Sequence, residues 1–336
     1  MLLHRISSLL ALVAGISSAA PFRSSMATRD LPPANNAVPT IGILSVPTAS
    51  AGSPCETLSA ETSCFSAFYS RWIMSAGARA VLLPYDAPPA VLTALLDSVN
   101  GVLLTGGGLD LGFQTPYMLT AKVVMDAARA KNVAGIFYPV HGTCQGFQVM
   151  ALLAAGDQGV LSKNAFDAEN ISLALDVTWD GHHSSRLLSA ETAPEDIVQI
   201  LSSTNSTLNL HHDGVRVKDF EASSALADAY ILVSTNFDRR GQAFVSTIEA
   251  WDAPFVGTQW HPERPQFEWR AVGANHGADT IKAMQYMASF LVDDARRNNQ
   301  SFADPALFAK YSVFSYPLVN APDAALSGYQ WYVVTV

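Results

Sequence analysis

Cysteine, charge and long apolar runs are scarce in this 336-residue chain. Charged residues make up only 15% and apolar residues 49%, which provides a large core and excludes disorder or a coiled coil for the whole chain. No apolar run reaches the roughly 18 residues of a membrane span, so we expect no membrane partner. The formal charge is −9, from 20 basic and 29 acidic residues without a Lys/Arg block, which argues against nucleic acid as a partner.

The N-terminus has the features of a secretory signal peptide, which we assign to residues 1–19. Arg5 supplies the positive end, a short apolar segment follows, and two small residues typical of a cleavage site close it. The alternative interpretation is a buried N-terminal helix. Residues 20–37 are polar and have no apolar periodicity, so we expect a disordered leader, followed by a single domain over residues 38–336.

Entry into the secretory pathway makes the three cysteines informative. Cys55 and Cys64 lie in a loop rich in Ser, Thr, Gly and Pro, and an oxidising compartment favours a disulfide between them. Cys144 then remains unpaired, and it is either buried and inert or free because chemistry needs its thiol. Three sequons fit the same compartment and are candidate glycosylation sites: Asn170, Asn205 and Asn299.

Short apolar segments alternate with longer helical ones from residue 39 onward. We expect strands at residues 40–44, 80–84, 101–105 and 135–140, separated by helices at 63–78, 89–99 and 116–131. The second half is richer in strands, expected at 229–235, 244–250 and 255–260, and it closes with a helix near 276–298. This alternation indicates an α/β fold with a mainly parallel central sheet and helices on both faces.

Cys144 lies between an expected strand and an expected helix, within the segment Gly142-Thr143-Cys144-Gln145-Gly146. Small residues around a nucleophile at a strand–turn–helix junction are typical of a nucleophile elbow, because glycine permits the sharp turn. The N-terminus of the helix favours the thiolate, which is the reactive form of cysteine. The alternative is a buried structural cysteine at the end of a core strand.

A cysteine nucleophile needs a base, an orienting group and an oxyanion hole. His261 is the candidate base, and Glu263 is its candidate partner, because side chains two residues apart in an extended segment point to the same side. The alternative is a surface His-Pro-Glu turn. Backbone N–H groups of Gly106, Gly107 and Gln145 are candidate oxyanion donors. Each of these segments follows an expected parallel strand, so all should meet at one edge of the sheet.

We expect no metal and no organic cofactor, because the cysteines and histidines show no zinc-ligand spacing and the proposed chemistry needs only a thiolate and an imidazole. The partner of such a site is a small-molecule substrate.

Three motifs carry a resemblance to the class I glutamine amidotransferase-like superfamily: Thr105-Gly106-Gly107-Gly108, Gly142-Thr143-Cys144-Gln145-Gly146-Phe147 and Gln259-Trp260-His261-Pro262-Glu263. Within it the chain is most similar to the γ-glutamyl hydrolase family, over roughly residue 39 to the C-terminus. Segments such as Tyr138-Pro139-Val140 and Asn209-Leu210-His211 support this finer resemblance. The resemblance implies a flavodoxin-like α/β fold.

By this resemblance, Cys144 is the nucleophile, His261 the general base and acid, and Glu263 its partner. His211 matches a second active-site histidine, although spacing alone does not distinguish it from His212, and a solvated loop histidine is the alternative. The family implies cleavage of γ-glutamyl bonds of folylpoly-γ-glutamates through a thioester, in the extracellular space, lysosome or vacuole. Its members commonly dimerise, so the resemblance also implies a homodimer.

Two residues bear on the substrate. Gln148 stands where these hydrolases carry Glu, and its amide can donate as well as accept a hydrogen bond. Arg186 is a candidate for binding a substrate carboxylate bidentately. Loss of Arg5 with the signal peptide takes the charge from −9 to −10. Because this charge repels a polyanion at neutral pH, and most histidines would be charged near pH ~5, we expect an acidic optimum.

Two other functions fit parts of the sequence. A glutaminase component of an amidotransferase would deliver ammonia to a partner synthetase, but the signal peptide and sequons argue against it. A non-catalytic binding protein on the same fold would have lost some of the catalytic residues, whereas the candidate nucleophile, histidine and carboxylate are all present.

Overall fold

The computed structural model describes residues 26, 30–48, 55, 62–189, 191–320 and 329–335. The expected signal peptide and most of the expected leader lie outside these residues. The last part of that leader, residues 30–37, has no regular secondary structure, but it is hydrogen-bonded to the domain. The backbone N–H of Asn36 donates to the carbonyl of Arg296 over 3.0 Å, which ties the end of this segment to the residues that follow α9 (Ala278–Ala295).

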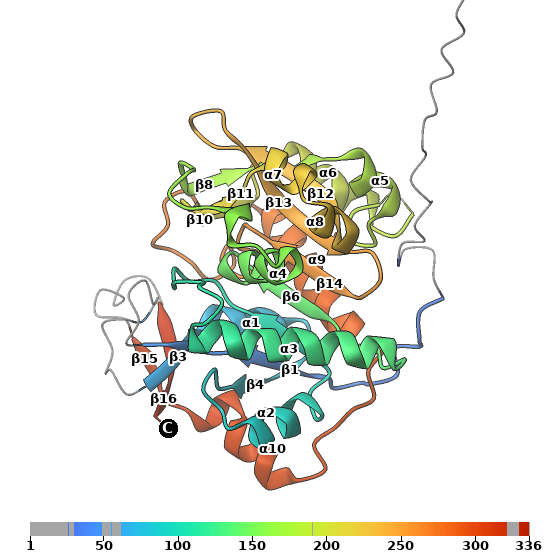
Figure 1. Cartoon of the computed structure of the whole chain (residues 1–336), viewed down its shortest axis with the longest axis vertical. Helices are drawn as coiled ribbons and strands as arrows, with labels where there is room; N and C mark the ends of the chain where they lie inside the picture. The colour runs from blue at the N-terminus through green and yellow to red at the C-terminus, as the bar shows by residue number, and fades with distance from the viewer. Residues whose placement is uncertain are drawn as a thin grey trace, which may run out of the picture.

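The core of the fold is an eight-stranded sheet in the order β4-β1-β5-β6-β14-β13-β12-β9 (Figure 1). Its first five strands are parallel: β4 (Arg79–Leu83), β1 (Thr40–Leu44), β5 (Gly101–Leu104), β6 (Val140–Thr143) and β14 (Phe255–Thr258). The other three are antiparallel: β13 (Ala243–Ala250), β12 (Tyr230–Phe237) and β9 (Asp176–Val177). The mainly parallel sheet and the additional strands of the second half are therefore confirmed.

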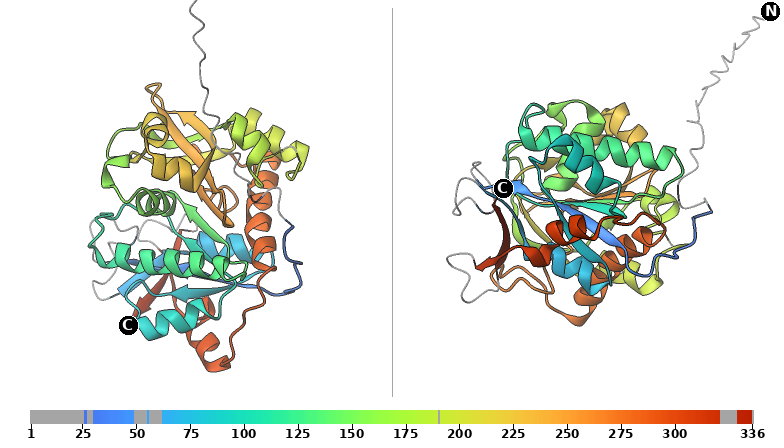
Figure 2. Two further views of the ribbon diagram at one scale, coloured as in Figure 1. Left: turned by 45° about the vertical axis from the view of Figure 1, so that its right-hand side comes forward. Right: turned by 90° about the horizontal axis from the view of Figure 1, so that it is seen from below.

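Helices cover both faces of this sheet. On one face, α1 (Ala67–Ser75) packs against α9 (Ala278–Ala295), and the indole of Trp72 donates to the carbonyl of Met284 over 3.0 Å (Figure 2). On the other face lie α2 (Pro89–Leu96), α3 (Pro116–Val133) and α4 (Gln145–Ala155), of which α3 and α4 are in front in Figure 1. The strands between these layers are buried on both sides, which explains their continuous apolar sequences.

The remaining α-helices of the described residues are short, and all belong to the second half of the chain: α5 (Trp179–Ser184), α6 (Glu195–Ser203), α7 (Val217–Ala222), α8 (Ser224–Ala229) and α10 (Pro305–Tyr311). No helix within the described residues is long and apolar enough to cross a membrane.

Three smaller sheets frame the carboxyl edge of the parallel strands. Two are antiparallel pairs: β8 (Ala168–Leu173) with β10 (Thr207–His211), and β7 (Leu161–Ser162) with β11 (Gly214–Val215). The third has the order β15-β16-β3-β2: β15 (Leu318–Asn320), β16 (Gln330–Thr335), β3 (Thr62–Ser66) and β2 (Val46–Pro47). Cys64 of β3 is disulfide-bonded to Cys55, with Cα atoms 6.6 Å apart.

Two expected elements differ from the structure. The helix expected at 63–78 begins only at residue 67, because residues 62–66 pair with β16, and the hydroxyl of Ser66 caps α1. The strand expected at 135–140 is found at 140–143. Pro139 has no N–H to give to a ladder, and Gly135 takes the left-handed conformation with φ +83°, so the apolar residues between them form a loop.

Candidate active site

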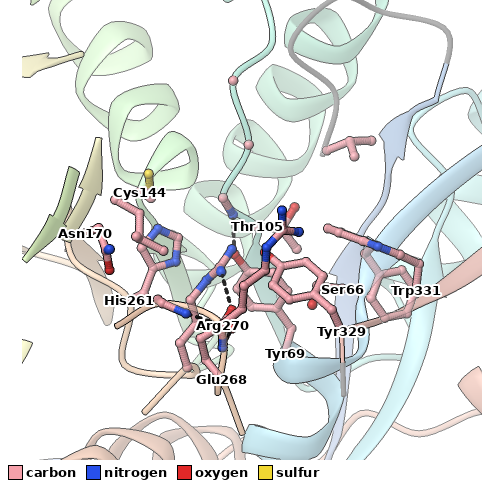
Figure 3. A pocket seen from close by; sticks show the side chains of 18 of the residues that line it. Ser66, Tyr69, Thr105, Cys144, Asn170, His261, Glu268, Arg270, Tyr329 and Trp331 are labelled. Atoms are coloured by element: carbon pink, nitrogen blue, oxygen red, sulfur yellow. Dashed lines mark hydrogen bonds and ion pairs between the residues drawn. The ribbon is translucent and has the colours of Figure 1, made fainter. Parts of the chain in front are cut away.

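Three neighbouring parallel strands end at the same edge of the sheet, and the loop after each of them carries a motif. Gly106 and the two following glycines come after β5, Cys144 after β6, and His261 shortly after β14. All three segments line one cleft, as expected from the sequence (Figure 3).

Cys144 occupies a strained turn between β6 and α4. Its φ of 52° and ψ of −105° lie outside the regions that L-residues prefer, and its N–H is tied to the carbonyl of Thr258 over 2.6 Å. A Cβ atom on Gly142 would lie 2.6 Å from the Met150 sulfur, and one on Gly146 would lie 2.3 Å from the Leu104 carbonyl oxygen. Both glycines are therefore required by close packing around the elbow, and the thiol between them is free.

His261 and Glu263 form a buried pair beside this thiol. The Nδ1 atom of His261 lies 2.8 Å from Oε1 of Glu263, and both side chains are almost fully enclosed. Burial disfavours the imidazolium, but the charges of Glu263 and the Cys144 sulfur more than offset it and raise the pKa of His261 to about 9. Burial likewise opposes ionisation of Glu263, but His261 and Arg264 hold the pKa of this carboxyl below its usual range. The site can therefore hold an imidazolium against a carboxylate.

The oxyanion donors differ in part from those expected. The N–H of Gly106 donates to the hydroxyl of Tyr69 over 2.7 Å, so it is already engaged, which corrects its assignment as an oxyanion donor. Gln145 is the first residue of α4, where a backbone N–H has no partner within the helix, and its side-chain oxygen accepts from Leu109 over 2.6 Å. This bond holds the glycine loop beside Cys144, leaving Gly107 and Gln145 as the candidate donors.

Tyr69 could not be recognised from the sequence, because it lies in a helix without a motif. Burial raises the pKa of Tyr69 well above its usual value, so its hydroxyl stays protonated as it accepts from Gly106.

Cys144 lies where two clefts meet. The larger, of about 640 Å³, extends from Cys144 and His261 to the aromatic residues Tyr329 and Trp331 at its far side (Figure 3). The smaller, of about 240 Å³, includes the side chains of His211, Gln148 and Lys163. A substrate whose reacting carbonyl sits at Cys144 therefore has room on two sides.

Two arginines of the larger cleft were not anticipated. Arg264 donates a hydrogen bond to Glu268 over 3.0 Å and lies 3.5 Å from Glu263, so these two carboxylates largely neutralise its charge. Arg270 lines the same cleft and is exposed. For Arg264, the only indication in the sequence was its position next to Glu263. Nothing in the sequence indicated Arg270.

His211 and Gln148 both line the smaller cleft. The Nδ1–H of His211 donates to the carbonyl of Asp213 over 2.9 Å, and burial lowers the pKa of His211 to about 3. His211 is therefore neutral at ordinary pH, and it is an exception to the expectation that most histidines are charged near pH ~5. Gln148 donates to the same carbonyl over 3.1 Å and to Gln259 over 3.2 Å.

Arg186 does not belong to the site, which corrects the prediction that it binds substrate. Its guanidinium is buried and bonds Asp294 over 3.0 Å and Glu249 over 3.3 Å. Neither cleft includes it. Two carboxylates already pair with this cation, so it has no remaining charge for a substrate and instead ties the segment after α5 to β13 and α9.

The three sequons lie in different surroundings. Asn170 lines the larger cleft, and its side-chain oxygen accepts from the N–H of Gly273 over 2.9 Å. Asn205 and Asn299 are exposed and line neither cleft. Among the described residues, no group of three or more His, Cys, Asp or Glu side chains is arranged to hold a metal ion.

A strained thiol, a buried His–Glu pair and a glycine loop at one edge of a parallel sheet are the features of a cysteine-dependent α/β enzyme. Residues 39–263 match the family model described as Peptidase C26, and the chain belongs to this family.

Several curated relatives are named as γ-glutamyl hydrolases. The chain is 34% identical over 237 residues to "Gamma-glutamyl hydrolase" of Mus musculus, covering 70% of this chain and 72% of that protein. It is 32% identical to "Gamma-glutamyl hydrolase B" of Dictyostelium discoideum, covering 74% and 71%, and 32% identical to "Gamma-glutamyl hydrolase 1" of Arabidopsis thaliana, covering 77% and 72%. The crystal structure of a putative GMP synthase protein from Thermoplasma acidophilum aligns with a TM-score of 0.42 at 17% identity, over 74% of this chain and 94% of that chain.

Proposed function

We propose that this chain hydrolyses γ-glutamyl bonds of folylpoly-γ-glutamates through a thioester on Cys144. The observation that carries the proposal is the thiol of Cys144, held in a strained elbow beside the buried His261–Glu263 pair. Membership of the Peptidase C26 family and the γ-glutamyl hydrolases among its relatives support this reaction class.

The first half-reaction forms the acyl-enzyme. The thiolate of Cys144 attacks the γ-carbonyl carbon, and the N–H groups of Gly107 and Gln145 bind the oxyanion of the tetrahedral intermediate. His261 then protonates the leaving amine nitrogen as the C–N bond breaks, which leaves a thioester. Glu263 stabilises the imidazolium that supplies this proton.

The second half-reaction returns the enzyme to its starting state. Neutral His261 takes a proton from water, the hydroxide attacks the thioester carbon, and the same N–H groups bind the second oxyanion. The C–S bond then breaks, its electron pair returns to sulfur, and the glutamyl carboxylic acid leaves. Besides the substrate and water, each step uses only groups of this chain, so the proposed mechanism requires no metal or cofactor.

The two clefts suit a substrate with carboxylates on both sides of the reacting bond. Arg270 lines the larger cleft, and Lys163 lines the smaller one beside Cys144. Lys163 lies 3.3 Å from Asp110, but unlike Arg186 it is exposed and has a single carboxylate partner. Poly-γ-glutamate presents one α-carboxylate per residue, so cations on either side of the nucleophile match its charge pattern. We assign Arg270 and Lys163 to this role in place of Arg186.

The N-terminal sequence supports a secreted or lysosomal/vacuolar location, with a signal peptide at 1–19 and the catalytic domain at 38–336. Glycosylation fits Asn205 and Asn299, because both are exposed away from the clefts. A glycan on Asn170 would project into the larger cleft, so we leave this sequon out. We retain a homodimer as part of the proposal.

The deciding experiment compares folate pentaglutamate and free glutamine as substrates of the purified protein, from acidic to mildly alkaline pH. Separation of the products by chain length shows which bonds are cut. We expect shortened folates with an acidic optimum and little ammonia from glutamine. A higher kcat/KM for glutamine would instead support the glutaminase component of an amidotransferase.

A further inference from the structure

The sulfur of Cys144 has a second polar neighbour besides His261. The side-chain amide nitrogen of Gln259 lies 3.6 Å from Sγ, within the range of an N–H···S hydrogen bond. Gln259 is fully buried, and its backbone N–H is fixed by the carbonyl of Ser246 over 2.8 Å. Gln259 and His261 both lie in the short segment after β14, and the side chains of both reach the sulfur.

The orientation of the Gln259 amide is determined by its surroundings. The carbonyl oxygen of Asp213 can only accept, so the Gln148 group that lies 3.1 Å from it must be the NH₂ end. The same NH₂ group lies 3.2 Å from the Gln259 amide, which must therefore turn its oxygen toward Gln148. The NH₂ end of Gln259 then faces Cys144.

The opposite orientation is unfavourable at both ends. Rotating the Gln259 amide by half a turn would place its NH₂ against the NH₂ of Gln148 and its oxygen against the Cys144 sulfur. Two donors would then face each other, and an acceptor would face a thiolate. The imidazole of His211 also donates to the Asp213 carbonyl, over 2.9 Å, which holds this fixed acceptor in place.

We propose that Gln259 is a further catalytic residue whose amide N–H binds the thiolate of Cys144, and that Gln148 is the positioning residue that keeps this N–H turned toward the sulfur. The donor is uncharged and keeps its hydrogen throughout the cycle, whereas His261 gives its proton to the leaving amine. Gln259 thus remains available when the C–S bond of the thioester breaks and its electron pair returns to sulfur.

The test measures how alkylation of Cys144 by iodoacetamide depends on pH, using peptide mapping to assign the label. Gln259→Leu removes the donor, and Gln148→Leu removes only the group that orients it. Gln242→Leu is the matched control, because this half-buried glutamine also loses two hydrogen bonds, to Ala165 over 2.9 Å and from Arg216 over 2.7 Å. It lines neither cleft.

We expect the pH of half-maximal alkylation to rise by about 1–2 units in Gln259→Leu, because a hydrogen bond to a charged group contributes about 1.5–3 kcal/mol. Gln148→Leu should give a smaller rise in the same direction, and Gln242→Leu none. An unchanged alkylation profile in both Gln259→Leu and Gln148→Leu overturns the proposal, as does a shift no larger than that of the control. If Gln259→Leu does not fold, Gln148→Leu decides alone.

This inference rests on Cys144 as the nucleophile of the proposed function, but alkylation needs no substrate. Full turnover by Cys144→Ala would refute the proposed function itself. An unshifted alkylation profile in an enzyme that depends on Cys144 would refute only the role of Gln259.

Discussion

His261 Nδ1 lies 2.8 Å from Oε1 of Glu263, and the two residues belong to one short segment that follows β14. Both side chains are buried, so neither charge is screened by solvent. This contact fixes which ring nitrogen carries the proton toward Glu263 and leaves the other nitrogen for the sulfur of Cys144.

Glu263→Gln should lower kcat by about 10²–10⁴-fold while the protein remains folded. The amide has nearly the same size, but it carries no charge to stabilise the imidazolium. Glu195→Gln, on the exposed surface of α6, is the control. Steady-state kcat measured beside the melting temperature checks this prediction, and a kcat within a few-fold of wild type would show that Glu263 is not the partner of His261.

The same pair predicts a loss of stability in alkali. The pKa of His261 is raised from 6.5 to about 9, so the folded state holds a proton that the unfolded chain releases. This contribution is fully present below pH ~6.5 and is lost as pH rises through about 9. Denaturant unfolding from pH ~7 to ~10 should therefore show a steeper decline for wild type than for His261→Gln. Parallel declines would contradict the raised pKa.

His211 predicts the opposite dependence in acid. Burial lowers its pKa from 6.5 to about 3. In mild acid the unfolded chain therefore binds a proton at His211 that the folded protein does not bind. Its contribution to stability is present above pH ~6.5 and falls as pH drops toward 3. Between pH ~7 and ~5, wild type should lose about 1–2 kcal/mol more than His211→Gln. His183→Gln, at an exposed histidine, is the control, and a variant that loses as much stability as wild type would contradict the neutral, buried His211.

Arg270→Gln should raise KM for folate polyglutamates several-fold and leave kcat nearly unchanged. The side chain lines the larger cleft and is exposed, so it is suited to attract a substrate carboxylate rather than to take part in bond breaking. Arg129→Gln removes an arginine of α3 that lines neither cleft and serves as the control. Equal KM values for Arg270→Gln and Arg129→Gln would show that Arg270 does not bind the substrate.

The parts of the structure that follow from local sequence could be predicted. Continuous apolar residues indicated β1, β4 and β5, because strands buried on both faces need no polar alternation. The edge at which Cys144 and His261 meet followed from the rule that parallel strands end on one side. The His261–Glu263 contact was expected from a spacing of two residues in an extended segment. The contact is present, but Pro262 and Glu263 lie in a turn, so the assumed extended geometry is wrong.

Contacts between residues far apart in the sequence could not be predicted. Arg186 was taken for a substrate ligand because its partners, Glu249 and Asp294, lie 63 and 108 residues further along the chain. Gly106 was taken for an oxyanion donor because its acceptor, Tyr69, lies in a helix 37 residues earlier. β3 was read as helix because its partner β16 comes from the end of the chain.

The proposed reaction depends most on a covalent glutamyl intermediate at Cys144. Wild-type protein mixed with folate pentaglutamate, quenched within milliseconds to seconds in acid and digested, can be analysed by mass spectrometry for an acyl group on the peptide that contains Cys144. We predict a pteroyl-glutamyl adduct on that peptide, and neither adduct nor shortened folates with Cys144→Ala. Hydrolysis by Cys144→Ala at the wild-type rate would contradict the account.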